Sequence, residues 1–346
     1  MTATSAPVAA LARGRRRRAL RRRTTVAGLA LLVLVLLAAT LMLGDTVYSP
    51  SEVLRTVLGQ TVPGASFTVG ELRLPRAVTG VLAGAAFGLA GTTFQTMLRN
   101  PLAAPDVIGI SSGASAAAVV GIVLLGLDQA ATSLVAIAGA LLTAGLITLL
   151  AYRDGVVGTR LILIGIGVSA MLDSVVSWVL LHAASWDVQT ALRWLTGSLN
   201  GATWDQAAPL AVAVLVTVPV LLAQERPLAL LRLGDDAAAG LGVRVERTRV
   251  VAILAAVLLI AFATAATGPI AFVAFLAGPI AARLVREGGS LMVPAALVGA
   301  ALVLAADLLG QQAFGNRYPV GVVTGVLGAP YLVLLLIRTN RAGGSL

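Results

Sequence analysis

The chain has 346 residues, of which 58% are hydrophobic and 12% are charged, and its formal net charge is +10. Soluble globular chains contain roughly 25% charged residues, so the composition excludes a soluble protein and indicates an all-α, polytopic membrane protein. There is no cysteine and a single histidine, which excludes disulfides, iron–sulfur clusters and thiolate metal sites. We therefore expect no cofactor, no metal centre and no catalytic residue.

Most of the positive charge lies at the N-terminus. Residues 1–23 contain eight arginines and no acidic residue, and the rest of the chain is close to neutral. A basic segment directly before an apolar run is typical of a cytoplasmic end under the positive-inside rule. Nucleic-acid binding is disfavoured, because no aromatic residues alternate with the arginines. We expect residues 1–23 and 339–346 to be cytoplasmic tails.

Apolar runs long enough to cross a hydrocarbon core of about 30 Å recur along the whole chain. An even number of crossings would return the C-terminus to the cytoplasm, and no connecting segment is long enough to fold as a soluble domain. We therefore expect residues 24–338 to form one multi-pass domain in the cytoplasmic membrane. The ten predicted transmembrane helices are 24–43, 77–97, 106–126, 131–151, 161–181, 206–223, 249–267, 269–285, 292–310 and 320–338.

The second predicted span is rich in small residues. Gly80, Gly84, Gly88 and Gly91 recur in it with alanines between them, a pattern that lets helices approach closely inside a membrane bundle. We expect this helix to be an inner wall and not a lipid-facing anchor. In the external segment before it, Ser49 followed by Pro50 predicts the N-cap of a short surface helix.

An acidic residue, Asp173, lies about 13 residues into the fifth predicted span, roughly 20 Å from its cytoplasmic end at helical rise. An ionisable residue inside the membrane is a functional candidate by default. Three interpretations of Asp173 are open. It is the ion site of an ion-coupled secondary transporter, or it lines a pore with Ser169 and contacts cargo. Alternatively, it is a structural acid that accepts hydrogen bonds from neighbouring serines.

The longest predicted cytoplasmic link, residues 224–248, is too polar to cross a membrane, yet its leucines recur at roughly helical spacing. Gly234 and the Gly240-Leu241-Gly242 run interrupt it, which predicts two short helices joined by a turn. A merely solvated loop would not need the leucines. We expect a compact surface element to which a partner docks.

Several blocks of the sequence match one known family. The chain resembles the permease subunits of type II ABC importers, the FecCD/BtuC-like family that moves ferric siderophores, haem and cobalamin, over residues 24–338. The matching blocks are LRLPR (72–76), RNPLAAPDVIGISSGA (99–114), WLTGSL (194–199), LRLGDDAAAGLGV (231–243), GPIAFVAFLAGPIAARL (268–284), AAD (305–307) and YPVGVVTGVLGAPYLVLLL (318–336).

The resemblance implies a ten-helix, BtuC-like permease fold and import by alternating access, with ferric siderophores as the expected cargo. The expected partners are a second permease subunit, two ATPase subunits and an external substrate-binding protein. The chain contains no lysine and so no Walker A lysine. We expect a transport subunit that is not itself an enzyme, with ATP hydrolysed by another chain.

The resemblance also implies roles for particular residues. Arg73 and Arg76 would dock the binding protein, and reversing both charges is expected to weaken docking while leaving assembly intact. Asn100, Pro101 and Leu102, together with Thr159, would form the cytoplasmic gate. The positions expected to couple to the ATPase are Leu233, Gly234, Asp235, Ala238, Leu241 and Gly242.

The chain departs from the family pattern in two places. Residues 278–283 read GPIAAR where many members have a Pro-His-Ile-Ala-Arg block. This variant resembles the second permease of systems that encode two, which favours a heterodimer over a homodimer. Near the place of an external family arginine the chain has Gln311 and Gln312, with Arg317 further on, which leaves a third contact with the binding protein in doubt.

Overall fold

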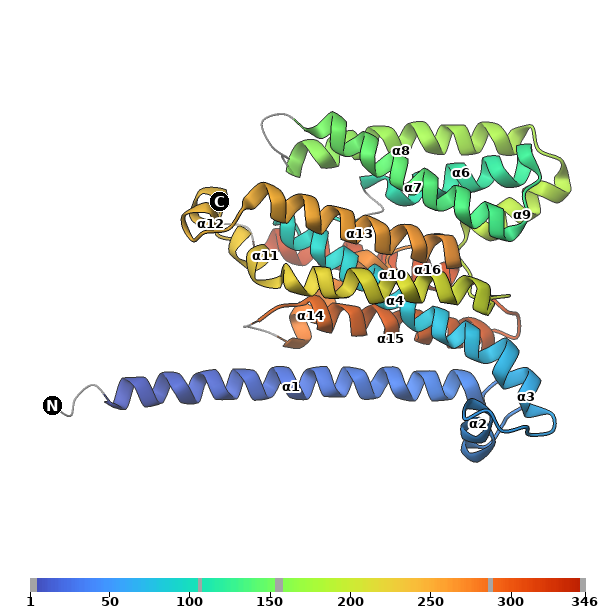
Figure 1. Ribbon diagram of the computed structural model, residues 1–346, viewed down its shortest axis with the longest axis horizontal. Coiled ribbons are helices and arrows are strands. Elements are labelled where there is room, and N and C mark those ends of the chain that lie inside the picture. The colour runs from blue at the N-terminus through green and yellow to red at the C-terminus, as the bar shows by residue number, and fades with distance from the viewer. Residues whose placement is uncertain (1–4, 105–107, 153–157, 286–288, 343–346) are drawn as a thin grey trace.

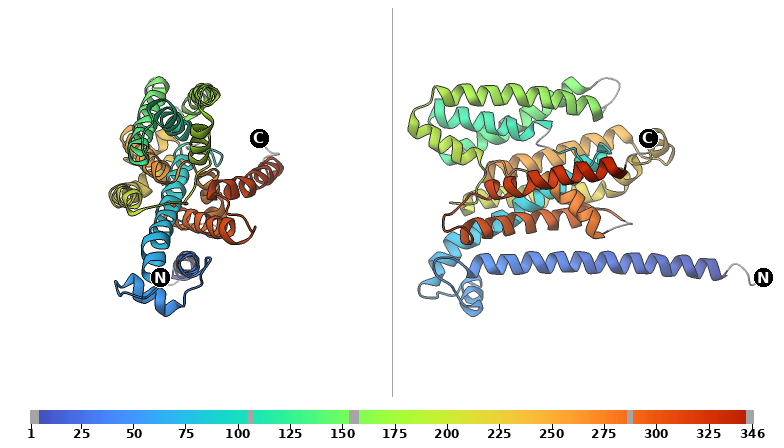
Figure 2. Two further views of the ribbon diagram at one scale, coloured as in Figure 1. Left: turned by 90° about the vertical axis from the view of Figure 1, so that its right-hand side faces the viewer. Right: turned by 180° about the vertical axis from the view of Figure 1, so that it is seen from behind.

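The computed structural model describes residues 5–104, 108–152, 158–285 and 289–342. These residues form an all-α bundle of long, roughly aligned helices (Figure 1, Figure 2). The elements are α1 (Ser5–Met42), α2 (Pro50–Val57), α3 (Ala65–Phe67), a π-helical segment η1 (Thr68–Arg73), α4 (Leu74–Met97), α6 (Ile110–Leu125), α7 (Gln129–Ala151), α8 (Gly158–Leu181), α9 (Ser185–Leu195), α10 (Trp204–Ala223), α11 (Glu225–Leu231), α12 (Asp235–Gly240), α13 (Val245–Thr267), α14 (Val273–Val285), α15 (Met292–Gln312) and α16 (Val320–Ala342).

Ten helical stretches of the described chain are apolar enough to account for the ten predicted crossings. Seven are also long enough to cross a membrane, and they comprise most of α1, the continuous α3–η1–α4 rod, α7, α8, α10, α13 and α15. The other three, α6, α14 and the first part of α16, are shorter apolar helices. The predicted ten-helix, multi-pass architecture is therefore confirmed.

Helix α4 runs through the middle of the bundle (Figure 1). It packs against α1, α10, α13, α14 and α15, and 17 of its 24 residues are buried. The exposed apolar residues of the protein lie instead on peripheral helices such as α7 and α8, as with Leu142 and Leu163. The small-residue helix is thus the inner wall that its sequence predicts.

The glycines of α4 permit direct contact between helix backbones. A Cβ on Gly84 would lie 2.5 Å from the carbonyl oxygen of Gly299 in α15. On Gly88 it would overlap the carbonyl of Ala295, also in α15, and on Gly91 that of Ala274 in α14. Because lipid tails give helices no hydrophobic drive to associate, close packing of this kind is a main source of stability in a membrane bundle.

Two of the predicted spans begin later than the sequence suggests. Helix α6 begins at Ile110 after Gly109, whose φ is +90°, and α14 begins at Val273 after Phe272, whose φ is +65°. Left-handed residues interrupt the helical hydrogen bonds at both places. Apolar residues lie on both sides of each left-handed residue, so hydropathy cannot locate the start of either helix.

The two ends of the bundle differ in their short helices. One end contains α2, α3 and α9, and the charge pattern predicts it to be external; we call it the outer end. Helices α11 and α12 lie at the opposite, inner end, together with the start of α1 and the end of α16 (Figure 1). The cap predicted for α2 is present as a capping box, in which Ser49 and Glu52 each bond the other's backbone. Helix α9 was not predicted.

Candidate functional site

At the outer end, Arg76 is bound inside the protein. Its Nε and Nη2 donate to the two carboxylate oxygens of Asp307 in α15, at 2.8 and 2.7 Å. The Asp307 side chain is only 2% exposed and that of Arg76 is 18% exposed. A bidentate, charge-assisted pair of this kind is strong and geometrically specific. It joins α4 to α15.

Arg73 also makes internal contacts. Its Nη1 donates to the backbone carbonyls of Leu41 and Met42 at 2.9 and 3.0 Å, and its Nη2 donates to that of Thr46 at 2.7 Å. The guanidinium carbon lies 5.1 Å from the centre of the Tyr48 ring. Because the last carbonyls of a helix have no partner within it, Arg73 acts as a side-chain cap for the end of α1.

A third arginine lies at the same place. Arg317, in the loop between α15 and α16, forms an ion pair with Asp45, and it lines a cavity of about 190 Å³ together with Arg73 and Arg76. This hydrogen bond holds the pKa of the Asp45 carboxyl below its usual range. Asp45 therefore stays ionised to a lower pH than a free aspartate, and the pair is lost only as the pH falls through this lowered pKa.

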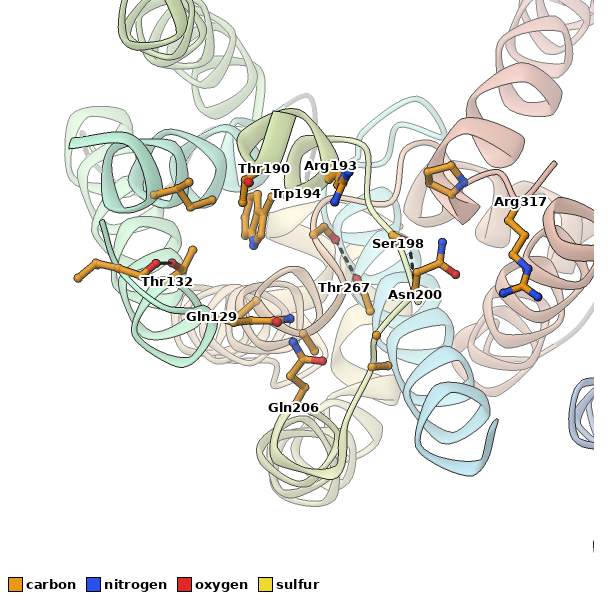
Figure 3. A pocket seen from close by; sticks show the side chains of 18 residues that line it. Gln129, Thr132, Thr190, Arg193, Trp194, Ser198, Asn200, Gln206, Thr267 and Arg317 are labelled. Carbon is orange, nitrogen blue, oxygen red and sulfur yellow. Dashed lines mark hydrogen bonds between the residues drawn. The ribbon is translucent and has the colours of Figure 1, made fainter. Parts of the chain in front are cut away.

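Sequence spacing did not predict the position of Arg317, because the loop after α15 turns back toward the bundle. Arg317 also borders a larger outer cavity of about 620 Å³, which polar side chains from several elements line (Figure 3). Thr190, Arg193 and Trp194 come from α9, and Gln206 comes from the first turn of α10. The outer surface thus contains two cavities that share Arg317 in their linings.

A groove of about 830 Å³ lies between α6 and α8 on one side and α14 and α16 on the other. Its lining is largely apolar, with Phe272, Phe275 and Leu332 among the larger side chains, and with serine hydroxyls from α6 and α8. The irregular residues before α6 and α14 also line it. Non-helical backbone is tolerated at membrane depth where it borders a cavity or is buried in protein.

Asp173 lies in this groove and is the one charged side chain among the described residues that line it. Ser177 donates to its backbone carbonyl at 2.9 Å, and no side chain in the described chain pairs with its carboxylate. The hydroxyls of Ser169 and Ser174 likewise donate to carbonyls of their own helix. In the described structure these three serine hydroxyls therefore bond backbone carbonyls and not the Asp173 carboxylate.

The structure places Ser169 differently from Asp173. Its hydroxyl lies at the contact between α8 and the residues before α6, where a Cβ on Gly109 would come within 2.5 Å of it. The described residues that line the groove do not include Ser169. Its predicted place in a pore has no support from these contacts.

At the inner end, α4 is followed by a tight turn. Arg99 has a φ of +52°, and the Asn100 side-chain carbonyl accepts from the backbone N–H of Leu102 at 2.9 Å. Leu102 extends from this turn into the groove lining. The turn at residues 99–102 is called the gate turn below. Thr159, the fourth predicted gate residue, lies in the first turn of α8, and its side chain is outside the described part of the structure.

The Gln95 amide holds the gate turn against α14. Its Nε2 donates to the carbonyls of Pro101 and Phe275, both at 3.0 Å. A Cβ on Gly278 would overlap the Gln95 side chain, so the glycine of the unusual GPIAAR block leaves room for this amide.

The predicted pair of short helices is present as α11 and α12. The six predicted coupling residues lie in α12 and the segments on either side of it, and they form three groups. Leu233 and Leu241 are 64% and 61% exposed, whereas Ala238 is buried and Asp235 forms ion pairs with Arg99 and Arg249. Gly234 and Gly242 both have positive φ, at +106° and +85°, which glycine adopts without strain.

Comparisons with known proteins agree with this arrangement. The FecCD transport family matches residues 31–338. The chain is 44% identical over 299 residues to the ferric enterobactin transport system permease protein FepG of Escherichia coli (strain K12), covering 86% of this chain and 91% of that one. It is 36% identical over 321 residues to the permease FepD of the same system and organism, covering 91% and 96%.

A solved structure assigned to a metal-chelate type ABC transporter, in an inward-facing conformation, superposes with a TM-score of 0.82 at 26% identity and covers 91% of this chain and 99% of that one. The family match, the relatives and the shared fold all extend over nearly the whole chain. The protein is a member of the FecCD transport family of membrane permeases.

Proposed function

We propose that this protein is the membrane-spanning permease subunit of an ABC importer for ferric siderophores in the cytoplasmic membrane. Cargo arrives on an external binding protein, passes along the groove by alternating access and leaves past the gate turn, while separate ATPase subunits supply the energy. The names of FepG and FepD support the cargo class. Family membership favours this function over an ion-coupled secondary transporter that uses Asp173.

The exposed leucines of the inner end are the observation that most supports a cytoplasmic partner. Leu233 and Leu241 flank α12, a helix with two acidic residues in its first turn, and both are more than 60% exposed. Two large apolar side chains so exposed on a polar element outside the membrane support a docking surface there. We propose that two ATPase subunits bind here, one on each permease of a dimer, and that both termini are cytoplasmic.

We propose a heterodimer of two different permeases. The GPIAAR block supports it, and so does the similarity to both FepG and FepD, two permeases of one transport system. Co-expression of this chain with a second FecCD-family permease of its own organism should yield a mixed dimer. Recovery of homodimers alone would favour the other arrangement.

The outer end is the proposed docking surface for the binding protein. Arg317 is 60% exposed in its ion pair, so it is available to acidic residues of a partner. Arg73 adds positive charge there because its hydrogen-bond partners are neutral backbone carbonyls, whereas Asp307 balances the charge of Arg76. Charges at a rim of this kind steer association and fix register more than they add affinity.

Co-purification and uptake together test the proposed function. The complex of both permeases and the ATPase, reconstituted in proteoliposomes with the binding protein, should accumulate ferric siderophore only when ATP is supplied. Leu241→Glu should release the ATPase. Leu54→Glu is the matched control for retention of the ATPase alone, because this leucine of α2 is 60% exposed at the opposite end. Uptake that depends on an ion gradient and not on ATP would refute the proposal.

A further inference from the structure

Asp235 is the first residue of α12, the helix proposed to meet the ATPase, yet its carboxylate is bound within the permease. Nη2 of Arg249, in α13, donates to both of its oxygens at 2.9 Å, and the Arg249 side chain is only 12% exposed. Nη2 of Arg99 donates to the same carboxylate at 3.3 Å. Two guanidinium groups from different elements thus fix one carboxylate.

Arg99 connects this carboxylate to the gate turn, of which it is the first residue. Its left-handed backbone directs the chain away from α4. On the other side of the turn, Gln95 joins the carbonyl of Pro101 to that of Phe275. A short series of polar contacts therefore leads from α12 to the gate turn, and from the gate turn to the helix that lines the groove.

We propose that Asp235 is a positioning residue, which transmits movement of α12 to the gate turn through Arg99 and does not contact the ATPase. The inference rests on the proposed function. Charge-assisted bonds hold α12, the gate turn and the start of α13 as one body, and movement of rigid bodies past one another is a common form of switching. A displacement of α12 by its partner would then displace Leu102 at the groove.

The Arg99 contact is suited to transmit movement more than to stabilise the fold. The side chains of Arg99 and Asp235 are 46% and 42% exposed, and ion pairs exposed to this degree add little to stability. Neutralising Arg99 should therefore leave the folded permease intact and remove only the link. Asp236, the next acid of α12, forms no ion pair with any described residue, so it is the matched control for Asp235.

The experiment compares Arg99→Gln, Asp235→Asn, their double variant, Arg99→Lys and Asp236→Asn in the complete complex in proteoliposomes. For the first two we expect the ATPase to remain bound and ATP hydrolysis to stay within about twofold of wild type, while ferric siderophore taken up per ATP falls at least fivefold. The double variant should be no worse than either single variant. Arg99→Lys should recover most of the uptake. Asp236→Asn, on the docking helix but outside the Arg99 contact, should keep the wild-type amount of siderophore taken up per ATP hydrolysed.

Wild-type uptake by Arg99→Gln would overturn the inference, and so would loss of the ATPase from both neutralised variants. If Asp235→Asn alone fails to assemble, because Arg249 is left without its partner, Arg99→Gln decides the question. A wild-type complex without ATP-dependent uptake would instead overturn the proposed function, and the inference with it. A working wild type with unaffected variants overturns the inference alone.

Discussion

Replacing Arg76 by Gln is expected to destabilise the permease, because it leaves the carboxylate of Asp307 buried and without its charged partner. The pair has two bonds of 2.8 and 2.7 Å, and the Asp307 side chain is 2% exposed. Removing one partner of a buried pair costs about 3–5 kcal/mol. For a chain of this size that loss lowers the melting temperature by on the order of 10 °C.

A double variant distinguishes an unpaired charge from lost packing. Arg76→Gln with Asp307→Asn leaves two neutral amides that are able to bond each other, so no buried charge remains. We expect the double variant to recover at least half of the stability lost by either single variant. Arg317→Gln is the exposed control. Its pair with Asp45 lies at the surface, where ion pairs often contribute nothing measurable to stability.

The assay is thermal unfolding of the purified permease in detergent, together with affinity for the binding protein in the variants that remain folded. Arg317→Gln should weaken binding and leave the melting temperature unchanged. The pair does not have the structural role that its geometry indicates if Arg76→Gln has the melting temperature of wild type. The same conclusion follows if the stability losses of the two single variants simply add in the double variant.

The buried pair of Arg76 and Asp307 also changes an expectation from the sequence. Reversing Arg73 and Arg76 to Glu was expected to impair docking and spare assembly, but a glutamate at position 76 would face the carboxylate of Asp307. Like charges at this separation cannot both ionise without a large cost. Loss of transport in that variant would therefore report misassembly as well as lost docking, and Arg317 is the cleaner position at which to test docking.

Two further predictions concern the bundle and the groove. Gly91→Ala should destabilise the protein by about 1–3 kcal/mol, because its Cβ would overlap the backbone of α14. Gly145→Ala, with open space around it on α7, should be neutral or stabilising by up to about 1 kcal/mol; equal thermal shifts would contradict this account. Asp173→Asn should raise uptake of anionic chelates and lower uptake of cationic ones, without changing ATP hydrolysis. The change should be about twofold per unit of cargo charge, as expected for charges roughly 8 Å apart in water. The same effect on a neutral chelate would refute a charge mechanism.

Local features of the chain predict most of the helices. Apolar runs locate the ten crossings, the glycines of α4 predict a central helix, and Ser49 and Gly234 predict a cap and a turn. Each of these depends on residues a few positions apart, whose backbone preference and burial are encoded in short windows. The late starts of α6 and α14 were missed, since hydropathy does not detect a left-handed residue at a helix start.

The contacts that give the functional residues their roles depend on the tertiary structure. Arg76 and Asp307 are 231 positions apart, and Arg99 and Asp235 are 136 apart. The sequence indicates that these residues are unusual in a chain so poor in charge, but the partner of a charge depends on how distant helices pack. The sequence by itself therefore determined the membrane bundle and its candidate residues, whereas only the packing decided which arginines are bound inside the protein and which remain available to a partner.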